Sequence, residues 1–276
     1  MVFTKSDIIG ILDEYKLSFY NTAYTALSQP DSRNLKKYRV AVRRLISFNY
    51  LIQLLAGGGY YKPIRKELKR IIKDFNPIRD NQVLLKIVNQ AIENNKNLES
   101  FKNYLLRSDD NYIDANIFYD LPKQFRRINT FLIWQKLYIS TNFPNNQELT
   151  KKFENSYSQL EGELCDEFSK VNIHDSDSIH HLRLTIKKFR YFDEAAQKIY
   201  NKKLKYDNII ELQDIMGEIQ DISVLQKQIK KYIHSSEKSS TEAIESYYNE
   251  MQSQKTEKIG EMILQINRNM NIEANC

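Results

Sequence analysis

The chain has 276 residues, of which 41% are hydrophobic and 28% are charged, a composition that indicates a globular protein and excludes a disordered one. Its net charge of +6 favours acidic partners. Two cysteines, Cys165 and Cys276, are too few for a disulfide framework or a zinc site of the usual spacing. Because neither a signal region nor an apolar run of membrane length is present, we expect a cytoplasmic protein without a membrane partner.

Glycine and proline are scarce, with seven and five residues, and this predicts an all-α fold. Apolar residues at helical spacing form a face from Leu35 to Leu55, which the glycines at 57–59 end. Pro63 begins the next helix, and Asn76-Pro77 is expected to break it. The stretch 94–120, rich in Asn and Asp, gives no clear prediction. The further helices are expected near 78–88, 123–139, 147–170, 177–200, 203–216, 219–234 and 240–267.

Positive charge is concentrated in two short segments of the chain. Residues 32–66 contain nine Lys and Arg and no acidic residue, and residues 178–190 also lack acidic residues. The two segments carry cations at matching positions, 144 residues apart, if His180 is counted as one. At 100° per residue, four residues of the second segment, His180, Arg183, Lys187 and Arg190, fall within about 80° of one helical face. These basic stripes are Lys36, Arg39, Arg43 and Arg44 in the first segment, and His180, Arg183, Lys187, Lys188 and Arg190 in the second.

A second pair of segments supports an internal duplication. Residues 75–84 align with residues 216–225, at an offset of 141. We therefore expect one domain over 1–276, made of an N-terminal half over 1–143 and a C-terminal half over 144–276. Asp80 and Asp221 correspond in the repeat, and one carboxylate per half fits a helix N-terminus better than a metal site.

The motifs resemble those of the CHAD domain, the conserved histidine α-helical domain. The resemblance rests on His180 through Tyr191, on Lys36 through Leu45, and on the segments 77–83 and 212–221. It implies two pseudo-symmetric four-helix bundles around a basic central cavity that binds inorganic polyphosphate without catalysis, in a protein that can associate with polyphosphate granules. The expected binding residues are Lys36, Arg39, Arg43, Arg44, Lys69, Lys73, Arg79, His180, Arg183, Lys187, Lys188 and Arg190.

The chain departs from the family pattern at three positions. Lys36 stands where the family has its first histidine, Ser47 replaces a basic residue, and Gln220 occupies the position equivalent to Arg79. His180 alone should then carry the pH dependence of binding, which is expected to tighten as the pH falls through the histidine range. Arg79 could instead form a structural ion pair with Asp80 or Asp221.

Polyphosphate binding requires a row of donors, which arginine forks and compact lysine charges provide. Sulfate or phosphate ions are expected to occupy the same residues when polyphosphate is absent. The alternatives are a nucleic-acid-binding protein with a convex basic surface and a phosphate-handling enzyme that uses His180. No phosphate loop, nucleophile motif, metal motif or cofactor motif supports catalysis. The aromatic residues Phe131, Trp134 and Tyr138 are expected to pack in the core, and Lys37 and His181 to lie on the surface.

Overall fold

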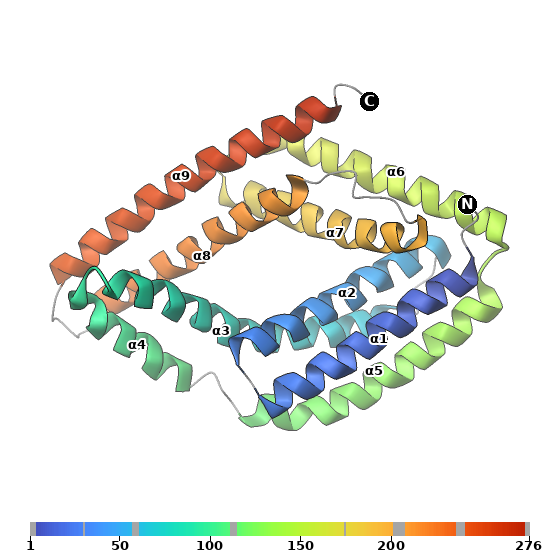
Figure 1. Ribbon diagram of the computed structural model, residues 1–276, viewed down its shortest axis with the longest axis horizontal. Helices are drawn as coiled ribbons and strands as arrows, with labels where there is room; N and C mark the ends of the chain where they lie inside the picture. The colour runs from blue at the N-terminus through green and yellow to red at the C-terminus, as the bar shows by residue number, and fades with distance from the viewer. Residues whose placement is uncertain are drawn as a thin grey trace. The chain divides into compact units, whose positions relative to one another are not determined.

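The computed structural model describes residues 4–29, 31–56, 61–110, 115–173, 175–200, 208–235 and 241–273. All regular structure in these residues is helical, which confirms the predicted all-α fold (Figure 1). The elements are α1 (Lys5–Ser28), α2 (Ser32–Ala56), α3 (Lys62–Ile92), the 3-10 turn η1 (Lys96–Leu98), α4 (Glu99–Asp110), α5 (Ala115–Asn142), α6 (Asn146–Lys170), α7 (Ser176–Tyr200), α8 (Asn208–His234) and α9 (Thr241–Glu273).

The predicted helix break at Asn76-Pro77 is wrong. Helix α3 runs through Pro77 without interruption, and α5 likewise contains Pro122. A proline inside a helix removes one backbone hydrogen bond and costs about 3 kcal/mol or more. Phe75 and Ile78, on either side of Pro77, are both buried. Burial of these side chains offsets the cost, so the packing keeps α3 continuous where the local sequence favours a break.

One further segment differs from the sequence-based expectation. In the helices predicted over 203–216 and 219–234, the described residues form the single helix α8, which begins at Asn208 and passes through Gly217. A glycine in a helix costs only about 1 kcal/mol, and its buried neighbours Met216 and Ile219 anchor this part of α8. The Asn- and Asp-rich stretch 94–120 contains η1, α4 and the start of α5. The glycine run at 57–59 lies outside the described residues.

The chain forms two compact units, and each unit combines segments that are distant in sequence. Unit 1 comprises Met1–Phe75, Ala115–Lys170 and Leu184–Lys205. Unit 2 comprises Asn76–Asp114, Val171–Arg183 and Tyr206–Cys276. Helices α3 and α7 each contribute to both units. The units therefore do not follow the halves 1–143 and 144–276, and the duplication and the basic central cavity stay predictions.

In unit 1, α1 packs against α2 and α5, and α2 also packs against α6 (Figure 1). Aromatic rings from four helices join these contacts. The Phe19 ring of α1 lies 5.7 Å from the Tyr38 ring of α2 and 5.4 Å from the Phe125 ring of α5. Tyr38 also contacts Phe75 of α3, with ring centroids 5.6 Å apart. This aromatic core fixes α2, and with it the first basic stripe.

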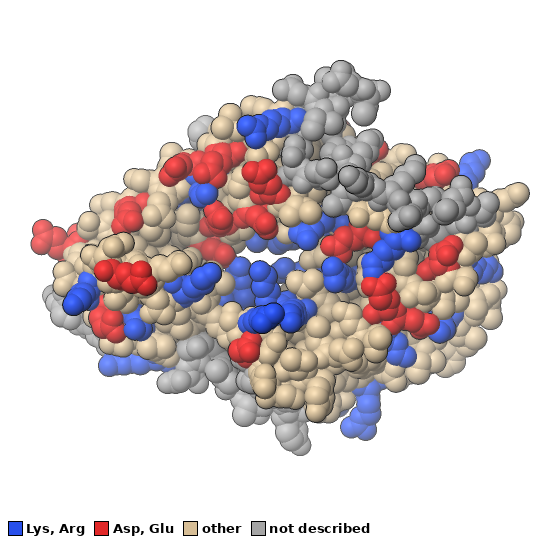
Figure 2. All heavy atoms as spheres, viewed as in Figure 1, with Lys and Arg blue, Asp and Glu red and all other residues tan. Residues whose placement is uncertain are grey.

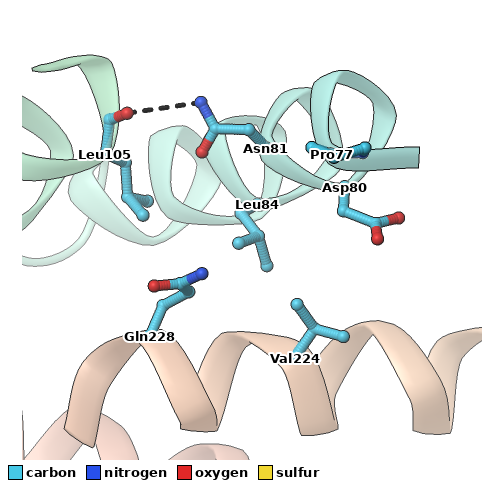
Figure 3. Close-up of a pocket in the computed structure, with 7 residues that line it drawn as sticks. All are labelled: Pro77, Asp80, Asn81, Leu84, Leu105, Val224 and Gln228. Atoms are coloured by element: carbon cyan, nitrogen blue, oxygen red, sulfur yellow. Dashed lines mark hydrogen bonds between the residues drawn. The ribbon is translucent and has the colours of Figure 1, made fainter. Parts of the chain in front are cut away.

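In unit 2, α8 and α9 pack as an antiparallel pair, as the contact between Gln226 Nε2 and Gln252 Oε1 at 2.7 Å shows. Helix α4 and η1 pack onto this pair. Figure 3 shows a cavity of about 140 Å³ among α3, α4 and α8, where Leu84 and Val224 face each other. Beside it, the Asn81 side chain donates a hydrogen bond to the Leu105 carbonyl at 3.2 Å. No Lys or Arg lines this cavity, so it offers nothing to a polyanion.

Unit 1 also contains a buried carboxyl group, that of Asp193 on α7, which is only 4% exposed. It accepts hydrogen bonds from Tyr157 Oη at 2.8 Å and from Gln197 Nε2 at 3.1 Å. Burial raises the pKa of Asp193, and the nearby Glu161 and Glu194 raise it further. The two hydrogen bonds favour the charged form, but they do not outweigh the burial.

A raised folded-state pKa predicts how Asp193 affects stability. The unfolded chain loses this proton first as the pH rises, so Asp193 favours the folded state below about pH 4. This contribution disappears as the pH rises through the folded-state pKa. Asp193→Asn replaces the carboxyl group with a neutral amide that does not ionise. The free energy of unfolding of the variant, taken relative to that of wild type, should therefore be higher at pH 7 than at pH 4. Urea denaturation at both pH values measures the change.

The control is Asp166→Asn, because Asp166 is exposed on α6. Its free energy of unfolding is expected to stay close to that of wild type at both pH values. If the free energy of unfolding of wild type increases with pH relative to that of Asp193→Asn, the effect assigned to burial is contradicted.

Candidate polyanion-binding residues

The structure distributes the twelve expected binding residues over both units. Unit 2 contains Arg79, His180 and Arg183, and the other nine residues lie in unit 1. Helix α7 is continuous, so His180, Arg183, Lys187 and Arg190 lie on one face of one helix. Lys37 and His181, predicted to lie on the surface, are exposed.

Four cations of unit 1 form no ion pair with an acidic residue in the part of the chain that the structure describes. Among the residues that the structure describes, no carboxylate forms an ion pair with Lys36 or Arg43 of α2, or with Lys69 or Lys73 of α3. Lys36, Lys69 and Lys73 are exposed, and Arg43 is half-buried. Arg39 lies in the same stripe as Lys36 and Arg43, and it is buried in the packing of α2. An anion that reaches the four unpaired cations gains their charge without displacing a carboxylate.

The remaining basic residues of the α7 stripe in unit 1 include two with carboxylate partners. Lys188 Nζ lies 2.5 Å from Glu163 Oε2 and 4.6 Å from the centre of the Tyr50 ring. Burial opposes the charge of Lys188, but the hydrogen bonds with Glu163 and Tyr50 are stronger, and the pKa of Lys188 is raised. Arg190 Nη2 lies 3.7 Å from Glu194 Oε1.

Glu194 also pairs with the first stripe, because Arg44 Nε lies 3.0 Å from its Oε2 atom. Burial opposes the charge of Arg44, but this ion pair prevails and raises the pKa of the guanidinium. A phosphate would have to compete with Glu163 or Glu194 for Lys188, Arg44 and Arg190. These three cations thus join α2, α6 and α7 within unit 1, and their positive charge is largely neutralised.

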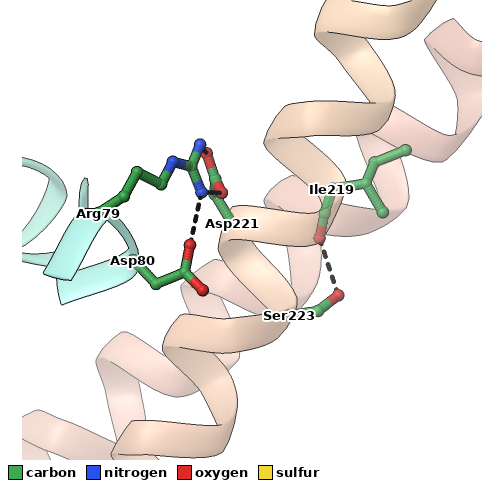
Figure 4. A network of polar contacts seen from close by, with 5 residues as sticks. All are labelled: Arg79, Asp80, Ile219, Asp221 and Ser223. Carbon is green, nitrogen blue, oxygen red and sulfur yellow. Dashed lines mark hydrogen bonds and ion pairs between the residues drawn. The ribbon is translucent and has the colours of Figure 1, made fainter. Parts of the chain in front are cut away.

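In unit 2, Arg79 forms the ion pair that the sequence left open (Figure 4). Its Nη1 and Nη2 atoms lie 2.7 and 3.1 Å from the two carboxylate oxygens of Asp221, a two-pronged contact between α3 and α8. Nη1 also lies 3.0 Å from Asp80 Oδ1. Burial opposes the charge, but the hydrogen bonds from Asp221 and Asp80 raise the pKa of Arg79. Arg79 therefore connects two helices, and its charge is already balanced by two carboxylates.

A second group of cations surrounds a cavity of about 140 Å³ in unit 2. His180 and Arg183 of α7 line it together with Lys255 of α9. No carboxylate of the described residues pairs with Lys255. Gln220, which replaces the counterpart of Arg79, also lines this cavity and adds a neutral amide.

The sequence did not identify Lys255 as a binding residue, because Lys255 belongs to neither basic stripe. Acidic side chains (red in Figure 2) gather over α9 on the face shown. A helix rich in acidic residues is not expected to contribute to the binding of an anion. Lys258, three residues later, pairs with Glu218 at 3.1 Å and with Glu261 at 2.9 Å. Helical phase is the one available signal, since Lys255 lies one turn before the apolar Ile259 and both line this cavity.

Gly217 lets Arg183 lie close to α8. A side-chain Cβ atom at Gly217 would sit 4.0 Å from Arg183 Nη2, which is ordinary van der Waals contact. A small residue therefore fits at position 217, whereas a larger one would have to share the space with the guanidinium. The second basic stripe thus reaches α8 at a glycine of the 216–225 repeat segment.

Comparison with known proteins identifies the family. The CHAD domain family model matches residues 20–230, most of the chain, and this chain belongs to the CHAD domain family. The structure is similar to the crystal structure of the CHAD domain from the plant Ricinus communis, with a TM-score of 0.77, 16% identity, and coverage of 96% of this chain and 92% of that one. It is also similar to PptA from Streptomyces chartreusis, with a TM-score of 0.73, 11% identity, and coverage of 96% and 98%.

At these identities the two structures establish the fold alone. No curated protein matches the chain in sequence. Of the helices that the structure describes, none combines the length and the apolar character needed to cross a membrane.

The ion pair of Arg79 predicts a clear loss of stability when the guanidinium is removed. Arg79→Ala leaves Asp221 half-buried and without its two-pronged partner, so the free energy of unfolding should fall by about 1–3 kcal/mol. Urea denaturation measures this change. The control is Lys170→Ala, which breaks the exposed pair with Asp166 at 3.3 Å. The control should change stability by no more than about 1 kcal/mol, and equal losses in both variants would show that the Arg79 ion pair contributes no more than an exposed pair.

Proposed function

We propose that this chain binds inorganic polyphosphate without altering it chemically. The CHAD domain family is known in polyphosphate-related proteins, which supports this ligand class. The observation that carries the proposal is a set of cations in unit 1 that pair with no carboxylate of the described residues, namely Lys36 and Arg43 on α2 and Lys69 and Lys73 on α3. Cations that share a helical face repel one another, so such an arrangement is stabilised when an anion neutralises it.

The chemistry of polyphosphate suits these side chains. The ligand carries about one negative charge per repeat and has acceptor oxygens on every side. Arginine forks bind two oxygens at once, whereas lysines act as compact charges that tolerate different positions of a flexible chain. The cations around the unit 2 cavity, His180, Arg183 and Lys255, extend the set of binding residues beyond the first stripe. A protein with these properties would associate with polyphosphate granules.

The second candidate function is nucleic-acid binding, because DNA and RNA also present rows of phosphates. One feature of the described residues favours the bare polyanion. Most aromatic side chains near the basic stripes, such as Tyr38 and Phe189, are buried and cannot stack on bases.

The third candidate, a phosphate-handling enzyme that uses His180, lacks a partner for the histidine. The described side chains that line the cavity with His180 include no Asp or Glu that could orient it or bind a metal ion there. Release of orthophosphate from polyphosphate in the presence of Mg²⁺ would establish this enzyme activity and contradict our proposal.

Replacing two unpaired cations should weaken polyphosphate binding. The double variant Lys36→Ala/Arg43→Ala removes two charges from α2 without breaking an ion pair between described residues. We expect the affinity to fall by about tenfold or more. The slope of log affinity against log salt concentration should become shallower by about one unit for each phosphate contact that is lost. Titration with long-chain polyphosphate at several salt concentrations measures both quantities.

The matched control is Lys37→Ala, which removes an exposed charge of α2 that lies off the stripe. It should leave affinity within about twofold of wild type, since a distant exposed charge is screened by salt. Competition distinguishes the ligands, because polyphosphate should displace labelled RNA or DNA and the nucleic acid should not displace polyphosphate. The reverse order of displacement would favour nucleic acid as the ligand.

Binding should also tighten as the pH falls through the histidine range, because a protonated histidine carries a positive charge. Protonated His180 attracts phosphate, whereas the neutral ring does not. Arg183 and Lys255 line the same cavity, and the His181 ring lies 6.5 Å from that of His180. The variant His180→Gln should lose this pH dependence, and His181→Gln should retain it. An unchanged pH profile in His180→Gln would refute the role of His180.

A further inference from the structure

Helices α1 and α5 of unit 1 lie side by side and run in opposite directions (Figure 1). Asp13 of α1 contacts Lys136 of α5, whereas Phe19, further along α1, contacts Phe125, earlier in α5. The first half of α1 therefore lies beside the last turns of α5, and the second half of α1 lies beside the earlier part of α5. The surface of this pair has an apolar end and a basic end.

A groove of about 340 Å³ runs between the two helices at the apolar end. Ile133 and Leu137 line it and are 54% and 51% exposed, although both are large and hydrophobic. Lys136 Nζ lies 2.6 Å from Asp13 Oδ2, so these two charges of the groove neutralise each other. The apolar lining residues are Ile9, Leu12, Leu132, Ile133 and Leu137.

Two further large side chains extend the apolar surface. Trp134, predicted from the sequence to pack in the core, is 63% exposed, and Leu17 of α1 is 62% exposed. Trp134 stands three residues before Leu137, so the two side chains are neighbours on α5. Exposed apolar side chains that gather around a groove are typical of a site that binds another molecule.

Cations follow the apolar residues toward the earlier part of α5. Arg126 stands seven residues, or two turns, before Ile133, so it continues the row of side chains along the groove. Lys123 lies one turn before Arg126, and Lys16 of α1 lines the groove itself. Lys123 and Arg126 are exposed, and Lys16 is half-buried. No carboxylate of the described residues pairs with these three cations.

We propose that the α1–α5 groove binds an acidic amphipathic helix of a partner protein. The apolar side chains of such a helix, spaced at i, i+4 and i+7, fill the apolar end, and its carboxylates meet Lys16, Arg126 and Lys123. A groove between two antiparallel helices accepts a third helix, because the side-chain ridges of that helix enter the groove. The charge of the three cations selects an acidic helix over a basic one, which they repel.

The length of the groove sets the length of the partner helix. Residues 126–140 of α5 extend about 21 Å, so about 14 residues of a helix cover them. A flat bilayer does not enter a groove between two helices. A nucleic acid or a bare polyanion gains charge pairing at the basic end but leaves the apolar end uncovered.

Designed peptides test the chemistry of the partner. The probe is a helical peptide of about 18 residues with leucines at i, i+4, i+7 and i+11, glutamates at one end, and no aromatic residue. A comparison peptide carries lysine in place of each glutamate. Trp134 is the only tryptophan of the chain, so its fluorescence reports the binding of either peptide. The acidic peptide should bind about tenfold or more tightly than the basic one. Equal affinities, or no binding of the acidic peptide, overturn the proposal.

Charge reversal in the protein provides a second comparison. The double variant Lys16→Glu/Arg126→Glu should prefer the basic peptide, because the charges at the groove change sign. The control Lys151→Glu reverses an exposed charge of α6 that does not line the groove, and it should keep the preference of wild type. Circular dichroism confirms folding, and the two peptides with wild type decide the question if the double variant does not fold. A folded double variant that still prefers the acidic peptide contradicts the proposal.

The apolar end is tested by Ile133→Glu, which should weaken binding of the acidic peptide by about tenfold or more. The control is Leu264→Glu, because Leu264 is 61% exposed on α9 of unit 2, and this variant should bind like wild type. Equal affinity of both variants would show that the apolar end is not used. Vesicles of phosphatidylglycerol and long-chain polyphosphate test the other sources of negative charge. If either displaces the acidic peptide at equal ionic strength, the groove binds a membrane or a polyanion and the proposal is wrong.

Discussion

Repulsion between like charges on α2 and α7 is the constraint on which the other features of this protein depend. A helix that carries cations at every turn of one face is destabilised by those cations unless its other faces supply enough apolar burial. Both helices meet this condition, since α2 buries residues such as Tyr38 and Phe48, and α7 buries Phe189 and Phe192. The apolar residues between the cations are therefore as necessary for a basic stripe as the cations themselves.

Carboxylates relieve the repulsion selectively. Glu194 and Glu163 pair with Arg44, Arg190 and Lys188, where helices of unit 1 meet. Asp221 does the same for Arg79 between α3 and α8. Lys36 and Lys73, which pair with no carboxylate of the described residues, are exposed to solvent. Lysine and arginine thus have two roles in this protein. Those with a carboxylate on a neighbouring helix join the two helices, and those without one are available to an anion.

The sequence predicted the helical fold because helical periodicity and the scarcity of glycine and proline are local properties. It misplaced the ends of α3 and α8 because Pro77 and Gly217 weaken a helix locally, whereas burial of their neighbours is a property of the packed unit. Trp134 was assigned to the core for the related reason that periodicity identifies a face of α5 but not what covers that face.

The sequence by itself determined which helical faces are basic, since the spacing of Lys36, Arg43, His180 and Arg183 fixes their angles about the helix axis. The motifs also sufficed to identify the CHAD domain family. Only the tertiary structure decided which cations are neutralised and that Lys255 joins His180 and Arg183 around one cavity. The physical reason is that charge pairing and desolvation depend on distances between helices that are far apart in the sequence, such as α3 and α8, and no local pattern encodes those distances.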